Sequence, residues 1–132
     1  MTASDGRPSV FLIDQQATWR NRSANALEAH GYAVRVLGSY EYPLPDANGI
    51  MQQPDLVVLG CATIGPEEQQ LIERVVENQH PLVVLCSLLS SQLMRMLFLA
   101  GAKDVAVKPH DETDLLAIVS EATMALASTV RP

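Results

Sequence analysis

The stretch PDLVVLGCATIGPEE (54–68) contains a strand, a loop and the start of a helix. Its apolar run DLVVL (55–59) is continuous instead of alternating, which is typical of a strand covered on both faces in a parallel sheet. Pro66 and the two glutamates after it suit the first turn of a helix, where a proline N–H is not needed and acids offset the dipole. In such sheets ligands lie outside the carboxyl ends of the strands. Gly60 and Cys61 stand at that end here, so a residue without a side chain occupies a position where chemistry is expected.

The same strand and helix unit recurs along the chain. Five short apolar runs predict strands: VFLI (10–13), AVRVL (33–37), DLVVL (55–59), PLVVL (81–85) and DVAV (104–107). Longer segments with helical period lie between and after them: 17–30, 66–79, 88–100 and 111–127. This order predicts an α/β fold, a doubly wound three-layer sandwich in which helices cover both faces of a five-stranded parallel sheet.

The crossover after the second strand breaks the pattern. The segment GSYEYPLPDANGIMQQ (38–53) contains Pro43 and Pro45, which exclude a regular helix through their positions. We expect a shortened or irregular helix there, at most a short piece around 46–52. The domain is expected to span 9–127, with a disordered tail at 1–8 and a second tail at 128–132.

Length and composition exclude several classes of protein. The 132 residues suit one domain with its own hydrophobic core, and no apolar run is long enough to cross a bilayer. The opening MTASDGRPS lacks the apolar stretch of a secretion signal, so we expect a cytoplasmic location. A net charge of −6 repels phosphate backbones, which disfavours direct nucleic-acid binding. Cys61 and Cys86 lack metal-ligand spacing and are expected to be reduced, half-buried thiols.

Several segments, in order and with similar spacing, resemble the receiver domains of two-component response regulators, the CheY-like family. The resembling segments are VFLIDQQ, LEAHGYAV, PDLVVLG, PLVVLCS and, most specific of all, AGAKDVAVKP. The resemblance covers about residues 9–127. It implies a flavodoxin-like sheet with strand order 2-1-3-4-5 and a role in phosphorelay signal transduction.

The resemblance also implies where a phosphorylation site would lie. In such receivers an aspartate after the third strand accepts the phosphoryl group, an acidic pair after the first strand helps to hold Mg²⁺, and a lysine and a hydroxyl contact the phosphoryl group. The matching positions here are Gly60 for the acceptor, Asp14 and Gln15 for the acidic pair, Cys86 for the hydroxyl and Lys108 for the lysine. The nucleophile, one of the two metal-binding carboxylates and the hydroxyl are therefore replaced, by Gly60, Gln15 and Cys86 respectively. We therefore interpret the chain as a pseudo-receiver that is not an enzyme and holds no metal or cofactor, with Asp14 and Lys108 expected to form an ion pair.

Other residues could still supply chemistry. Cys61 could act as a nucleophile one position late, although alternation along the strand points its side chain away from the missing carboxylate. Glu67 and Glu68 are acids near enough to serve as alternative acceptors. The three histidines are scattered at element ends without ligand spacing, so they predict no metal site.

The helix expected over 88–100 is apolar around most of its circumference, which indicates deep burial or a contact surface. We assign Met94 and Phe98 to its buried stripe. The residues assigned to a partner face, together with one from the fifth strand, are Leu93, Met96, Leu97, Leu99 and Val105. The preferred hypothesis is a noncatalytic signalling module that contacts a protein partner or its own output domain, as a homodimer. The alternatives are a receiver phosphorylated on a non-standard acceptor and a sensor of a small ligand or of redox state in the vacated pocket.

Overall fold

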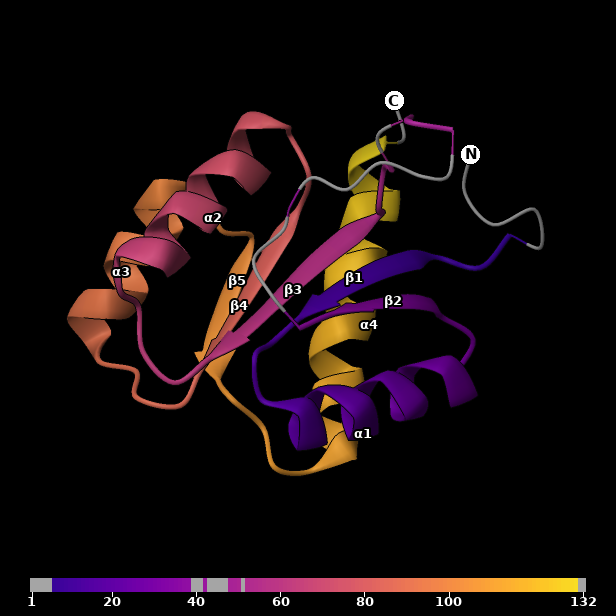
Figure 1. Ribbon diagram of the computed structural model, residues 1–132, viewed down its shortest axis with the longest axis horizontal. Helices are drawn as coiled ribbons and strands as arrows, with labels where there is room; N and C mark the ends of the chain where they lie inside the picture. The colour runs from indigo at the N-terminus through magenta and orange to yellow at the C-terminus, as the bar shows by residue number, and fades with distance from the viewer. Residues whose placement is uncertain (1–5, 39–41, 43–47, 51, 131–132) are drawn as a thin grey trace.

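A central sheet of five parallel strands organises the protein (Figure 1), and its strand order is β2-β1-β3-β4-β5. The computed structural model describes residues 6–38, 42, 48–50 and 52–130, with side chains as far as residue 125. The strands are β1 (Ser9–Ile13), β2 (Ala33–Leu37), β3 (Leu56–Cys61), β4 (Leu82–Cys86) and β5 (Asp104–Val107). The strand order and the doubly wound α/β class are as predicted, and every predicted strand is present.

Four helices in the described part of the chain cover the two faces of the sheet. They are α1 (Ala17–Ala29), α2 (Pro66–Glu77), α3 (Ser91–Ala100) and α4 (Glu112–Val130). Figure 1 shows α1 and α4 on one side of the sheet and α2 and α3 on the other. This arrangement is the three-layer sandwich expected from the sequence.

The core is divided by the sheet into two apolar clusters. Side chains alternate along each strand, so Val10 and Val58 point to the face under α1 and α4, whereas Phe11 and Val57 point to the face under α2 and α3. Strands β3 and β4 are buried at every position because they lie in the centre with helices on both faces. Burial on both faces explains why the sequences of these two strands are continuously apolar.

Local signals set most helix ends. Ser90 caps α3, with its Oγ accepting a hydrogen bond from the Leu93 N–H at 3.1 Å, so this helix begins at Ser91 and not at residue 88 as predicted. Gly101 ends α3 at φ 117°, a left-handed conformation that favours glycine. The Asp111 carboxylate accepts from the Thr113 N–H at 2.7 Å at the start of α4. Helix α4 continues to Val130, beyond its predicted end at residue 127.

The irregular crossover between β2 and β3 can be followed only in part. The short helix expected around 46–52 and the first five residues of the tail expected at 1–8 lie outside the described residues, except for 48–50 and 52, which form no helix. Within the described residues, no helix has the length and apolar character needed to span a membrane.

Candidate functional site

A polar hollow of about 470 Å³ opens at the carboxyl ends of β1 and β3. Four residues that the sequence assigned to the pocket line it: Asp14, Gln15, Gly60 and Lys108. Parallel strands bring these positions to the same edge of the sheet, although they are up to 94 residues apart in the chain (108 minus 14). The predicted location of the site is therefore the place where its residues meet.

Asp14 is held firmly at the end of β1. Its backbone N–H donates to the Leu37 carbonyl at 3.1 Å, and its Oδ1 accepts from the Gln16 N–H at 2.7 Å. Its Oδ2 lies 2.7 Å from Lys108 Nζ. Asp14 is only 2% exposed and Lys108 only 7% exposed, so the predicted ion pair exists and is buried. Removing one partner of such a pair leaves an uncompensated buried charge.

The Lys108 ammonium group contacts three side chains of the protein. Besides Asp14, its Nζ donates to Gln16 Oε1 at 3.1 Å and lies 4.5 Å from the centre of the Trp19 ring. Trp19 is itself fixed, because its Nε1–H donates to the Pro109 carbonyl at 3.0 Å and its ring is 6% exposed. An ammonium group has three N–H donors, and two oxygen atoms of the protein itself, Asp14 Oδ2 and Gln16 Oε1, lie within hydrogen-bond distance of Lys108 Nζ.

The space next to Gly60 is already filled. A Cβ atom built on Gly60 would collide with Asp14 Oδ2 and would lie 3.1 Å from Trp19 Cζ3. An aspartate at this position would need Asp14 and Trp19 to move and would bring two carboxylates together. The glycine is thus part of a packed cluster of Asp14, Lys108 and Trp19, which we call the Asp14 cluster.

The residues at this site do not fit a Mg²⁺ ion. Mg²⁺ prefers anionic oxygen ligands in an octahedral arrangement. The residue after Asp14 is Gln15, which carries no negative charge, and the Asp14 carboxylate is bound to Lys108. In the parts of the chain that the structure describes, no three His, Cys, Asp or Glu side chains lie close enough to hold a metal together.

The fifth predicted pocket residue, Cys86, does not belong to the hollow, so this assignment was wrong. Its side chain is completely buried on the face under α2 and α3, and its Sγ contacts the carbonyls of Ala62 at 3.5 Å and Leu88 at 3.6 Å. The next residue, Ser87, lines the hollow instead. The reason is the alternation of side chains, which turns positions 86 and 87 in different directions.

Cys61 lies on the boundary between the hollow and the core. It pairs with Cys86 in the β3–β4 register, and the two Sγ atoms are 3.9 Å apart, so both thiols are free. They are more deeply buried than the half-buried thiols that the sequence suggested. Burial, and next the adjacent Cys86 thiol, raise the pKa of Cys61 well above its usual value. A thiol that stays protonated is a poor nucleophile.

Of the two glutamates considered as alternative acceptors, only Glu68 lines the hollow. Its Oε1 accepts from the Gly65 N–H at 2.8 Å, which caps the first turn of α2. Glu67 is exposed and does not line the hollow. Glu68 is therefore the better placed of the two.

The structure places two of the residues that were assigned to a partner face in the core. Leu97 and Val105 are buried in the core, 3% and 5% exposed, so neither is available to a partner. Phe98, which was assigned to the core, is 44% exposed. Residues 100° apart around a helix cannot all face inward, and the structure places the inward stripe on Leu93 and Leu97.

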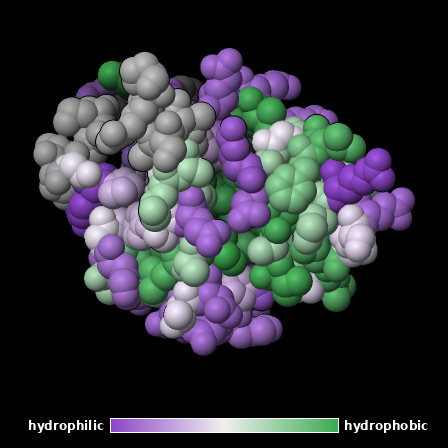
Figure 2. Space-filling view, turned by 180° about the vertical axis from the view of Figure 1, so that it is seen from behind, coloured by the Kyte–Doolittle hydropathy of each residue, from purple (hydrophilic) through white to green (hydrophobic). Residues whose placement is uncertain are grey.

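The remaining apolar residues of this region form an exposed surface. We define the α3–β5 surface by its most exposed members in these two elements and the loop before α3: Leu88, Phe98, Leu99 and Val107, with exposures of 70%, 44%, 80% and 58%. Figure 2 shows hydrophobic side chains gathered on the side of the molecule that carries α3 and β5. Met96, at 50% exposure, lies beside α2.

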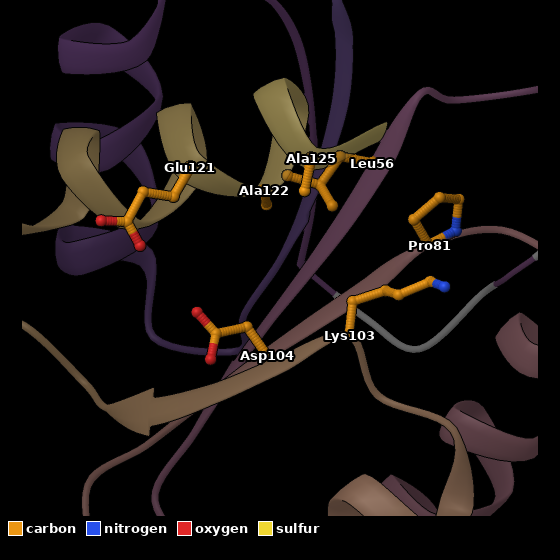
Figure 3. A pocket seen from close by; sticks show the side chains of 7 residues that line it. All are labelled: Leu56, Pro81, Lys103, Asp104, Glu121, Ala122 and Ala125. Carbon is orange, nitrogen blue, oxygen red and sulfur yellow. The ribbon is translucent and has the colours of Figure 1, made fainter. Parts of the chain in front are cut away.

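A second hollow, of about 270 Å³, lies at the opposite ends of the strands, between the first residues of β3 and β5 and helix α4. Figure 3 shows the carboxylates of Asp104 and Glu121 directed toward the same space, with Lys103 extended away from them. Asp104 Oδ1 accepts from the Val105 N–H at 2.9 Å. None of the residues that define the Asp14 cluster lies here.

Sequence reasoning missed Trp19 and Gln16, which complete the environment of Lys108. One signal was available for Trp19, because it is the single tryptophan of the chain and follows Asp14 by little more than one helical turn. No sequence pattern marks Gln16 as the partner of a lysine 92 residues away.

Comparison with known proteins places the fold among receiver domains. The sequence matches no protein-family model and no curated protein. Among solved structures, a CheY-like response regulator receiver domain from Methanospirillum hungatei is similar with a TM-score of 0.75 and 16% identity, over 94% of this chain and 99% of that one. A response regulator from Thermotoga maritima has a TM-score of 0.73 and 24% identity, over 89% and 98%. HP1043, an orphan response regulator of H. pylori, has a TM-score of 0.72 and 19% identity, over 89% and 98%.

Proposed function

We propose that this protein is a noncatalytic signalling module with a receiver fold, which acts by protein contact without being phosphorylated. The receiver fold supports a role in signalling. The observation that carries the rest is the Asp14 cluster. Gly60 offers no nucleophile, and the room that an acceptor would need is taken by the Asp14 carboxylate and the Trp19 ring.

The Asp14 cluster also accounts for how a receiver could work without a phosphoryl group. In receivers the lysine after the fifth strand offsets the negative charge that phosphorylation adds. Here the Asp14 carboxylate, 2.7 Å from Lys108 Nζ, supplies a negative charge from within the chain. Because this charge belongs to the chain itself, Lys108 has an anionic partner without phosphorylation, and we expect the protein to keep one signalling state.

The partner surface in this proposal is the α3–β5 surface. Large exposed apolar side chains gathered on one side of a small protein usually mark an interface. Two copies of this surface would bury Leu88 and Leu99, the two most exposed leucines described, in a homodimer. The proposal also allows another occupant of this surface, which is a partner protein or an output domain of the same polypeptide. We place the protein in the cytoplasm. Its net negative charge disfavours direct contact with DNA.

The test of phosphorylation independence is intact mass after incubation with Mg²⁺ and acetyl phosphate, with a conventional receiver alongside as positive control. We expect no adduct on this protein while the control is labelled. A labile, Mg²⁺-dependent adduct would overturn the proposal. If that adduct disappears in Glu68→Gln and persists in Glu67→Gln, the chain is a receiver with a non-standard acceptor, because only Glu68 lines the hollow.

The test of the α3–β5 surface is molar mass in solution, measured by light scattering. We expect a dimer for the parent and a folded monomer for Leu99→Glu. Val36→Glu is the matched control, because Val36 is an exposed apolar residue (42%) on the opposite edge strand and its replacement should leave the dimer intact. A monomeric parent, or loss of the dimer in both variants, contradicts the assignment.

A redox function has little support in the structure. Cys86 is fully buried, and the raised pKa of Cys61 keeps its thiol protonated at neutral pH. Both properties are typical of inert structural cysteines.

A further inference from the structure

A hollow of about 150 Å³ lies between helices α2 and α3, outside the Asp14 cluster and outside the α3–β5 surface. Its walls are mainly apolar, and we call it the α2–α3 groove. The residues that matter for the argument are Ile64, Ile72, Leu93, Met96, Ala100 and Glu73.

The groove lies beside the place where the end of α3 comes close to α2. At the end of α3, a Cβ on Gly101 would lie 2.9 Å from Val76 Cγ1, so the chain is pressed against α2 there. One residue earlier, the small side chain of Ala100 leaves room that a leucine would fill. Met96 lines the same space and is 50% exposed, so the groove opens to solvent.

The size of the groove suits one large apolar side chain. An apolar cavity of about 150 Å³ is sufficient for a benzene-sized group. Binding hot spots are typically single aromatic or aliphatic anchors that fill such pockets. The flexible Met96 side chain can adjust to the shape of the anchor.

The rim of the groove is acidic on the α2 side. Glu73 lines it, and Glu77, one turn further along the same helix, is also exposed. Neither glutamate forms an ion pair with a described residue. The nearest cation on α2, Arg74, directs its Nε–H to the Tyr42 carbonyl at 2.8 Å. Arg95 projects from the outward side of α3, opposite buried Leu97.

We infer that the α2–α3 groove binds an amphipathic helix of a partner protein that inserts one large apolar side chain and places lysine or arginine against Glu73 and Glu77. A helix laid between two helices is a common mode of peptide recognition, and charge complementarity selects a basic segment. The net charge of −6 also favours approach of a basic partner. This inference rests on the proposed function, because it names the chemistry of a protein that the signalling module would contact. The contact lies outside the α3–β5 surface.

The experiment uses a designed, end-blocked, lysine-rich helical peptide of about 16 residues with a central phenylalanine. Binding is followed by methyl NMR of the full chain and by fluorescence anisotropy of the labelled peptide. We expect shifts at Leu93, Met96 and Ile72 upon addition of peptide. Replacing the phenylalanine by alanine, or the lysines by glutamates, should weaken binding about tenfold or more, which corresponds to about 1.4 kcal/mol.

Two protein variants locate the site. Ala100→Leu fills the groove from an exposed helix position and should weaken binding about tenfold, whereas Ala29→Leu, the same exchange at the exposed last residue of α1, should leave it unchanged. Glu73→Lys should weaken binding, and this effect should shrink in high salt. Unfolding temperatures confirm that each variant is folded.

Three results would overturn the inference. The first is no binding of the peptide, and the second is binding that Ala100→Leu does not affect. The third is shifts in the groove that depend on protein concentration without peptide, which would mean that a second copy occupies it. None of them changes the acetyl phosphate result, so failure of this inference and failure of the proposed function are distinguishable.

Discussion

Replacing Gly60 by alanine inserts one methyl group into the Asp14 cluster. The backbone of Gly60 lies outside the left-handed region, so alanine is not strained by its φ angle, and only the contacts with Asp14 Oδ2 and Trp19 Cζ3 oppose it. Overpacking of this kind costs about 1–3 kcal/mol. Alanine also lowers the conformational entropy of the unfolded chain, which stabilises the folded protein by about 0.4–1 kcal/mol. We therefore expect Gly60→Ala to lower the free energy of unfolding by about 1–2 kcal/mol.

Gly60→Asp is expected to be worse, and it should not restore a phosphorylation site. Its carboxylate would be placed next to Asp14, and relief of the clash would draw Asp14 away from Lys108. Breaking a buried ion pair costs about 3–5 kcal/mol, so the loss should approach that range. Incubation with acetyl phosphate should still give no adduct.

Urea unfolding followed by tryptophan fluorescence measures these changes, because Trp19 is the single tryptophan and lies over Lys108. The matched control repeats Gly60→Ala in a background with Asp14→Ala and Lys108→Met, where both charges and the clashing carboxylate are absent. There the cost should fall below about 0.5 kcal/mol. If Gly60→Ala is as stable as the parent, or if its cost is the same in both backgrounds, the reasoning that the acceptor space is filled is refuted.

Three further predictions concern other parts of the molecule. Lys108→Met alone should lower the free energy of unfolding by about 3–5 kcal/mol, measured in urea, because it strands a buried carboxylate; a loss below 1 kcal/mol would argue against a buried pair. Leu97→Ala should cost about 2–5 kcal/mol. Leu99→Ala should stay within about 0.5 kcal/mol of the parent, and equal thermal shifts for the two would reverse the assigned helix phase. Burial lowers the pKa of His80. The unfolded chain thus binds more protons just below about pH 6.5, so the contribution of His80 to stability is complete above that pH and declines as the pH falls toward its folded pKa. Urea midpoints from pH 8 to 5 should show a shallower decline in His80→Gln, and an identical decline would remove His80 as a cause.

The location of the site was predictable because its residues stand at the ends of strands. Any chain whose buried parallel strands end at Asp14, Gly60 and Lys108 must bring these residues to one edge of the sheet. The absence of a nucleophilic side chain at position 60 is visible in the sequence because glycine carries no side chain. The filling of the vacated space was not visible, since it depends on Trp19 and Gln16 reaching a lysine that is distant in sequence.

The sequence pattern of α3 predicts a helix but does not predict which side of the helix is buried. The segment SQLMRMLFLA is apolar around most of its circumference, so its pattern fixes the helix but not the rotation of the helix on the sheet. The packing of the helix against the sheet decides that rotation, and it buries Leu97 while exposing Phe98.

The sequence by itself determined the α/β order, the buried central strands and the absence of a side chain at position 60. These properties follow from local hydrophobicity and residue identity, which need no knowledge of the rest of the chain. Only the tertiary structure decided that Asp14 and Trp19 occupy the space beside Gly60, that Cys86 faces the core and that a groove remains between α2 and α3. Those properties are set by how separate elements pack against each other, and side-chain volume and helix rotation have no counterpart in a linear pattern.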